Sequence, residues 1–280
     1  MRGDKTPLSF AQRIRFILRS LGLVAALLVF VPLHYLYRIF RYGSPFPMWF
    51  LGTAAWICGA RVRRIGTPLR RDVFFVANHI SWIDILALAG ASGTAFVAKQ
   101  ELSEVPIIGW LCSLNRTVFV KRENRMGVAE QVNALREALA DNWSVTVFPE
   151  GTTTDNRSLL PFKTSMLSVL EPPPPGVLVQ PVMLDYGKVG EEIGWIGDEG
   201  GINNARRVLG RKGSFRVDIH FLEPFSPDQY RGRKAIGQKA REEIETALIE
   251  SVGPLRDFAH TVAAVRYTSR QAENAEPPAP

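Results

Sequence analysis

The chain has 280 residues, enough for one sizeable domain of helices and strands with a short addition. Hydrophobic residues make up 46% of the sequence and charged residues 22%, a globular composition that excludes global disorder. The net charge of +7 favours a negatively charged partner, either nucleic acid or an anionic membrane surface. The two cysteines and four histidines are widely spaced, so we expect neither a disulfide framework nor a structural metal.

The N-terminal 60 residues contain two apolar segments. No charge interrupts the chain from Leu21 to Leu33, and a second apolar run extends from Pro45 to Cys58 after a break at 42–44. A membrane span needs about 20 apolar residues, so the first segment is marginal for crossing a bilayer and sufficient for entering it. We therefore predict that residues 1–60 form a membrane-embedded helical segment, a hairpin that enters one leaflet of an anionic membrane surface.

Two other interpretations of this segment were weighed. A cleaved signal peptide also begins with basic and then apolar residues, but the sequence at 32–35, Pro-Leu-His-Tyr, is a poor cleavage site. The aromatic residues fit interface anchors better. A buried helix of a soluble protein is the remaining alternative.

Residues 61–267 are expected to form one domain, followed by a disordered tail at 268–280. Short β-rich runs alternate with helical patterns, which predicts an α/β fold with a mixed, largely parallel sheet flanked by helices. Apolar residues recur at helical spacing over 125–141 and 234–252. Strands are predicted at 73–77, 94–98, 117–120, 144–148, 177–183 and 215–221.

The first predicted strand ends at Asn78-His79, and Asp84 follows the histidine by five residues. The carboxyl ends of strands are where α/β folds present reactive side chains. His79 and Asp84 can meet only if the histidine lies in the turn and the aspartate in the first helical turn. Asp84 would then fix the imidazole tautomer and leave the other nitrogen to accept a proton. The alternative is a structural histidine and a helix-capping aspartate.

A second polar turn, Phe-Pro-Glu-Gly-Thr at 148–152, follows the fourth predicted strand. Gly151 lets the backbone approach a ligand closely, and Glu150 can hold a ligand hydroxyl. After the third strand, Arg122 would suit a phosphate or another lipid head group. The alternatives are a plain turn with a solvated acid and a solvated basic strand end.

These residues together resemble the glycerolipid acyltransferase family, which includes bacterial 1-acylglycerol-3-phosphate acyltransferases. Four blocks stand in the family's order over roughly residues 74–185: 78–84 for its NHxxxxD motif, 117–122, 148–152 and 179–182. The resemblance implies that His79 is a general base oriented by Asp84. It also implies that the acceptor-binding residues are Arg122, Glu150, Gly151 and Thr152, with Pro181 shaping the pocket.

By this resemblance the chain is a membrane-associated O-acyltransferase at the cell membrane, with its catalytic domain facing the cytoplasm. It would move a fatty acyl group from acyl-ACP or acyl-CoA to the hydroxyl of a lysophospholipid such as 1-acyl-sn-glycerol-3-phosphate. The thioester donor is a co-substrate, and no cofactor is expected.

The sequence also departs from the family pattern. Thr153 and Thr154 stand where an Arg-Ser pair is usual, which disfavours a phosphate-bearing acceptor. The stretch at 148–163 looks closer to lyso-ornithine lipid acyltransferases, whose acceptor lacks a phosphate. The identity of the acceptor, the donor, the acyl-chain length and the oligomeric state therefore stay open.

Three rival functions were considered. The chain has no GxSxG sequence, which argues against a serine hydrolase. A non-catalytic lipid-binding membrane protein would explain the apolar N-terminus but leaves the two polar turns unexplained. Nucleic-acid binding is not expected, because the basic residues are spread out without interleaved aromatic residues.

Overall fold

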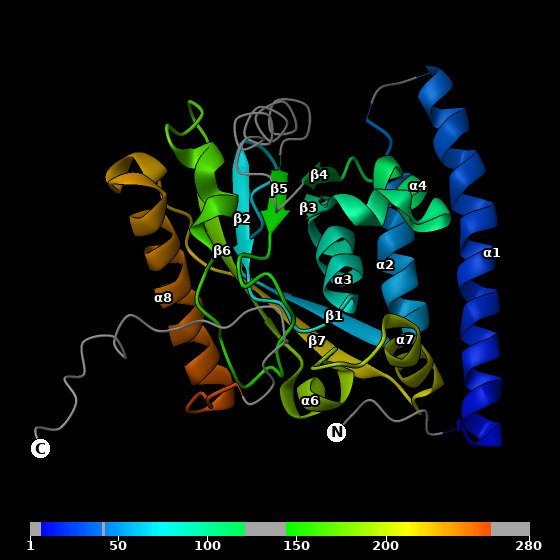
Figure 1. Cartoon of the computed structure of the whole chain (residues 1–280). Helices are drawn as coiled ribbons and strands as arrows, with labels where there is room; N and C mark the ends of the chain where they lie inside the picture. Colours follow the sequence, from blue (N-terminus) through cyan, green and yellow to red (C-terminus); the bar gives the residue numbers. More distant parts are fainter. Residues whose placement is uncertain (1–6, 41–42, 121–143, 259–280) are drawn as a thin grey trace, which may run out of the picture.

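The computed structural model describes residues 7–40, 43–120 and 144–258. Its centre is a seven-stranded sheet in the order β1-β7-β6-β2-β5-β3-β4 (Figure 1). The six predicted strands are confirmed with small shifts at their ends. The strand bounds are β1 Ala60–Ile65, β2 Val73–Ala77, β3 Ala95–Lys99, β4 Val118–Val120, β5 Ser144–Val147, β6 Leu178–Asp185 and β7 Phe215–Phe221.

The sheet is mixed and largely parallel, as predicted. Strands β2 to β6 pair in parallel, while β7 lies antiparallel to β6 and β1 pairs in parallel with β7. The five residues of β2 are all fully buried, because both faces of the sheet are covered there. Continuous apolar runs such as 73–77 therefore mark its central strands.

Strand β1 was not predicted from the sequence. Its central four residues, Arg-Val-Arg-Arg at 61–64, are all exposed, so neither a buried run nor a two-residue alternation is present. Pairing with β7, from Ala60 opposite Phe215 to Ile65 opposite His220, makes this segment the edge strand of the sheet. Charged side chains are typical of an edge strand, where they discourage pairing with another chain.

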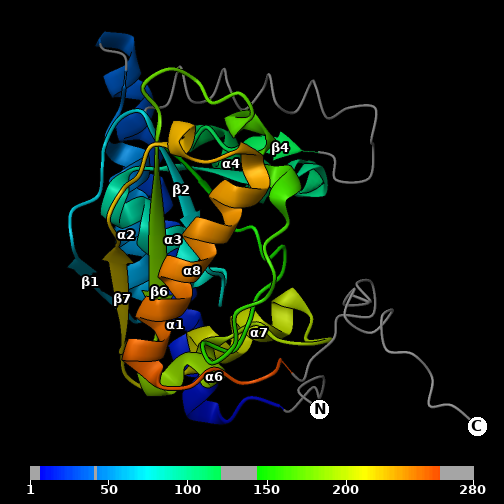
Figure 2. The same ribbon diagram turned by 90° about the vertical axis from the view of Figure 1, so that its left-hand side faces the viewer.

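Helices cover both faces of the sheet (Figures 1 and 2). On one face α3 contacts α2, and α2 contacts α1; on the other face α8 packs against β6. The predicted helix at 234–252 is confirmed as α8, whereas that at 125–141 and the tail at 268–280 lie outside the described residues. The helix bounds are α1 Phe10–Phe40, α2 Phe46–Cys58, α3 Ile83–Ser92, α4 Pro106–Leu114, α6 Gly190–Ile193, α7 Gly201–Gly210 and α8 Gly232–Val252, with 3-10 turns at Gln100–Glu104, Thr164–Leu170, Gly187–Val189 and Pro227–Gln229.

The two N-terminal apolar segments form α1 and α2. Helix α1 has 31 residues, longer than the uncharged segment, and among the described helices it alone is long and apolar enough to cross a membrane. Its outward side exposes large apolar side chains, including Leu18, Leu21 and Leu28. This exposed apolar surface fits the predicted membrane segment and not a buried soluble helix.

Arginine side chains attach α1 to α7. Arg19 donates hydrogen bonds to the carbonyl oxygens of Val208 and Leu209 at 3.1 Å and of Gly213 at 2.7 Å. Arg15 donates to the carbonyl oxygen of Gly210 at 2.8 Å. The last carbonyls of a helix lack intrahelical partners and carry partial negative charge, so guanidinium groups stabilise them. The N-terminal half of α1 is thereby fixed to the α/β domain.

Candidate active site

The two polar turns lie together at one edge of the sheet. Strands β2 and β5 are parallel neighbours, with Val76 paired to Val147. His79 follows the end of β2 by two residues, and Glu150 follows the end of β5 by three. Both turns therefore emerge at the carboxyl edge, as the sequence predicted.

His79 and Asp84 form a hydrogen-bonded pair. The Nδ1 atom of His79 lies 2.8 Å from Oδ2 of Asp84. The histidine is in the turn after β2, and the aspartate is in the first turn of α3, which is the arrangement that their spacing requires. Within the described residues, no hydrogen bond occupies the other ring nitrogen, Nε2, and the His79 side chain is 18% exposed. Nε2 is thus the nitrogen that can take a proton from a substrate.

Asp84 is held by four donors. Its Oδ2 atom also accepts the backbone N–H groups of Ile80 at 2.7 Å and Ser81 at 2.9 Å. Its Oδ1 atom accepts the phenol O–H of Tyr186 at 2.5 Å. The carboxylate is fully buried, so these donors replace the water that it lacks.

Tyr186 is a site residue that the sequence did not reveal. It directly follows β6 and is buried beneath the site. Burial and the adjacent charge of Asp84 raise the pKa of Tyr186 well above its usual value. Its phenol therefore stays protonated and donates to the carboxylate throughout the physiological pH range.

The second polar turn holds the backbone of His79 from both sides. Oε1 of Glu150 accepts the N–H of His79 at 2.8 Å. The carbonyl oxygen of His79 accepts the N–H of Thr154 at 2.7 Å and its hydroxyl at 3.1 Å. The residues at 150–154 therefore fix the backbone position from which the imidazole projects.

The structure places Glu150 in the interior. The side chain is only 1% exposed, and its second oxygen, Oε2, accepts the N–H of Leu160 at 2.9 Å. Burial raises the pKa of Glu150 to about 8, although the two backbone N–H donors act in the opposite direction. Both carboxyl oxygens of Glu150 thus accept backbone N–H groups, one of them from His79.

Aromatic rings support the imidazole. His79 stacks on Phe148 with ring centroids 4.1 Å apart and an interplanar angle of 15°. Phe148 in turn stacks on Phe96 at 5.8 Å. Stacking fixes the plane of the imidazole ring. The hydrogen bond to Asp84 fixes the rotation of the ring within that plane.

The remaining predicted site residues are placed differently. Gly151 has φ +73°, a backbone conformation that favours glycine, and a Cβ atom here would lie 2.6 Å from Nζ of Lys163. Thr152 is half-buried beside it. Pro181 is buried inside β6 and pairs with Val76, three residues before His79. Arg122 lies outside the described residues.

A buried polar network anchors the turn after His79. The indole Nε1 of Trp82 donates to Oδ1 of Asn204 in α7 at 2.9 Å, and Asn204 donates to Glu199 at 2.8 Å. Arg207 binds both oxygens of Glu199, at 2.9 and 2.7 Å. The segment at 197–201 thus leads into α7, a helix that supports the site.

Comparison with known proteins agrees with this geometry. The family model described as Acyltransferase matches residues 61–185. The lyso-ornithine lipid O-acyltransferase of Rhizobium meliloti (strain 1021) is 38% identical over 214 residues, which cover 70% of this chain and 73% of that protein. The chain belongs to the acyltransferase family.

Two further relatives extend the comparison. The acyltransferase is 31% identical to the lyso-ornithine lipid O-acyltransferase of Brucella abortus (strain 2308), over 85% of this chain and 95% of that protein. The crystal structure of the 1-acyl-sn-glycerophosphate (LPA) acyltransferase, PlsC, from Thermotoga maritima has a TM-score of 0.62 and 24% identity, covering 85% of this chain and 97% of that one. This likeness confirms the fold. The catalytic activity is that of a lysolipid acyltransferase.

Proposed function

We propose that this acyltransferase esterifies lyso-ornithine lipid. Two relatives that bear this name match most of the chain. In the structure, the proposal is supported by the burial and hydrogen bonding of Thr153 and Thr154, which replace the usual Arg-Ser pair. Both are buried, and their hydroxyls donate to backbone oxygens, of Trp195 for Thr153 and of His79 for Thr154. Neither position therefore offers a cation that could bind a phosphate. The head group of lyso-ornithine lipid contains no phosphate.

The proposed mechanism is direct transfer. The acceptor hydroxyl gives its proton to Nε2 of His79 as its oxygen attacks the thioester carbonyl carbon. The C–S bond then breaks, and the protonated imidazole returns the proton to the departing thiolate. Asp84 stabilises the imidazolium through Nδ1. General base catalysis contributes about 10²- to 10⁴-fold, so positioning of the reactants supplies the remainder.

The donor and the location belong to the same proposal. An acyl thioester on acyl carrier protein or coenzyme A supplies the fatty acyl group. Attachment through α1 places the enzyme at the cell membrane, and the catalytic domain faces the cytoplasm, where these donors are found. The net charge of +7 suits an anionic leaflet, near which each basic residue contributes about 1 kcal/mol.

Release of free thiol by the purified full-length protein tests the proposal. Lyso-ornithine lipid and 1-acyl-sn-glycerol-3-phosphate would be compared as acceptors, each with acyl-ACP and with acyl-CoA. We expect turnover with lyso-ornithine lipid and little with the phosphate-bearing acceptor. The opposite preference would overturn the assignment of the acceptor and leave the transfer chemistry intact.

A further inference from the structure

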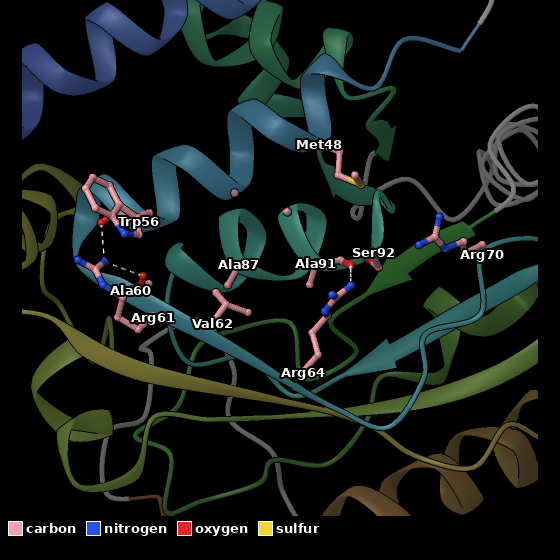
Figure 3. Close-up of a pocket in the computed structure, with 12 residues that line it drawn as sticks. Met48, Trp56, Ala60, Arg61, Val62, Arg64, Arg70, Ala87, Ala91 and Ser92 are labelled. Atoms are coloured by element: carbon pink, nitrogen blue, oxygen red, sulfur yellow. Dashed lines mark hydrogen bonds between the residues drawn. The ribbon is translucent and has the colours of Figure 1, made fainter.

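A second candidate lipid site lies away from His79. A cavity of about 550 Å³ opens between α2, α3 and β1, and no residue of the His79 site lines it (Figure 3). Met48, Gly52 and Trp56 line it from α2 at intervals of one helical turn. Because the spacing follows the helix axis, the cavity is an elongated groove along α2.

The wall formed by the two helices is apolar. Gly52 of α2 faces Gly90 of α3 so closely that a Cβ atom on Gly90 would lie 2.5 Å from the Cα of Gly52. Ala87 and Ala91 continue this surface along α3. Because the two helices touch at these glycines, they form one continuous apolar surface against which an alkyl chain can lie.

The opposite wall is cationic. Arg61 and Arg64 come from β1, and Arg70 comes from the segment that leads into β2. In the part of the chain that the structure describes, no carboxylate lies within ion-pair distance of these three guanidinium groups, and none lines the cavity. Arg63, the strand neighbour of two of them, is by contrast paired with Asp218 at 2.7 Å. Three uncompensated guanidinium groups along one groove favour an anionic ligand.

Two of the arginines are held in place without losing their charge. Arg61 lies over the ring of Trp56, 4.8 Å from its centroid, and donates to the Trp56 carbonyl oxygen at 3.0 Å. Arg64 donates to the carbonyl oxygen of Ala91 at 3.5 Å. Trp56 itself is 61% exposed at the mouth of the groove, a position typical of tryptophan at a membrane interface.

We propose that this arginine groove, lined by Met48, Trp56, Arg61, Arg64, Arg70 and Ala91, binds an anionic phospholipid of the membrane. The phosphate lies on the arginine side of the groove, and one acyl chain lies along the apolar wall of α2 and α3. A free inorganic anion would leave this apolar wall unused. Helix α1, which exposes large apolar side chains, packs against α2, the helix that forms part of the apolar wall. The site is independent of the acceptor that His79 acylates.

Calorimetric titration of the full-length protein in a non-ionic detergent tests the proposal. The probe is a short-chain phosphatidylglycerol, compared with short-chain phosphatidylcholine and with inorganic phosphate. We expect saturable binding of one phosphatidylglycerol per chain, with affinity at least about tenfold above that of either comparison ligand. Equal binding of phosphatidylcholine would overturn recognition by charge. Equal binding of inorganic phosphate would overturn the assignment to a lipid.

Matched variants localise the binding. Combined Arg61→Gln, Arg64→Gln and Arg70→Gln should weaken phosphatidylglycerol binding by about tenfold or more. Combined Arg206→Gln, Arg231→Gln and Lys234→Gln removes the same charge from exposed positions on and beside α7 and α8, and should leave binding unchanged. Acyl transfer to a micellar acceptor should stay within about twofold in both, because neither set touches the His79 site. Equal affinity of the two triple variants would overturn the proposal.

Single substitutions keep the test valid if the triple variant does not fold. Arg70→Gln removes an exposed side chain outside any strand or helix. Ala91→Leu places a larger side chain in the groove at its apolar wall and leaves the three arginines unchanged. Each should weaken phosphatidylglycerol binding by about threefold or more, and Ala91→Leu should leave the binding of inorganic phosphate unchanged. Unchanged lipid binding in both single variants would count against the site.

Discussion

Asp84 has four hydrogen-bond donors, and three of them come from residues that lie within five positions of it in the sequence. The local spacing therefore made the His79–Asp84 pair predictable. The fourth donor, Tyr186, is 102 residues away, and Asn204 is 122 residues from Trp82. Contacts of this kind depend on how the strands are ordered, so no local pattern reveals them. Glu150 was found from its turn, but its burial could not be seen in the sequence.

Tyr186→Phe tests the fourth donor. Without the phenol, Asp84 keeps three of its four donors and is held less firmly in the position from which it orients the imidazole. We expect kcat to fall by about tenfold at neutral pH with KM unchanged, the scale of one hydrogen bond to a charged group.

The control for this prediction is Tyr230→Phe, at a half-buried tyrosine that packs against Phe225. The values of kcat and KM of both variants would be measured against the wild type at neutral pH. A raised KM with unchanged kcat in Tyr186→Phe would contradict a role of the phenol in positioning the general base.

Glu150 should make stability depend on pH. Its pKa is about 8 in the folded protein, against about 4.3 for an unperturbed glutamate, so folding takes up a proton between these values. Stability from this residue is therefore complete below about pH 4 and is lost as the pH rises towards 8, by at most about 1.4 kcal/mol per pH unit.

Glu150→Gln should remove this part of the slope. It should also lower the free energy of unfolding by about 1–3 kcal/mol, because an amide nitrogen cannot accept the second backbone N–H. Denaturant unfolding between pH 5 and pH 8 measures both effects, with Glu223→Gln as the exposed control. Equal pH slopes in the two variants would contradict the raised pKa.

At the scale of elements, burial decided which strands were predictable. Strands β2 and β5 are buried throughout and appear in the sequence as short apolar runs. Strand β1 is an exposed edge rich in arginine, and α7 follows a glycine-rich turn with only four apolar side chains in ten residues. Both owe their structure to neighbours that are distant in sequence, β7 for the strand and α1 for the helix.

Arg19→Ala tests the attachment of α1 to α7. The substitution removes three hydrogen bonds to backbone carbonyls, and we expect the free energy of unfolding to fall by about 2 kcal/mol. Arg13→Ala is the control, because Arg13 is exposed and, among the residues that the structure describes, its side chain bonds only to the carbonyl oxygen of Leu8. Thermal unfolding and limited proteolysis in detergent would be compared, and equal behaviour of the two variants would rule out this anchoring role.

The whole molecule combines an apolar outer helix with a basic charge. Leu28 on α1 is 72% exposed, and in a membrane this position would contact lipid. Leu28→Glu should reduce partitioning onto anionic vesicles by about a hundredfold, since an acidic side chain in the bilayer costs about 3 kcal/mol.

Ile249→Glu, at an exposed apolar position of α8, is the matched control and should bind vesicles like the wild type. Cosedimentation with the vesicles measures the bound fraction. If Leu28→Glu bound as tightly as this control, α1 would not be the attachment element.

The most direct measurement is release of thiol from an acyl thioester by the wild type and by His79→Ala, each shown to be folded and membrane-bound. His220→Gln, at a histidine of β7 outside the site, serves as the control. Loss of the general base should reduce transfer by about 10²- to 10⁴-fold, with His220→Gln near the wild-type rate. Full transfer activity in His79→Ala would contradict the account.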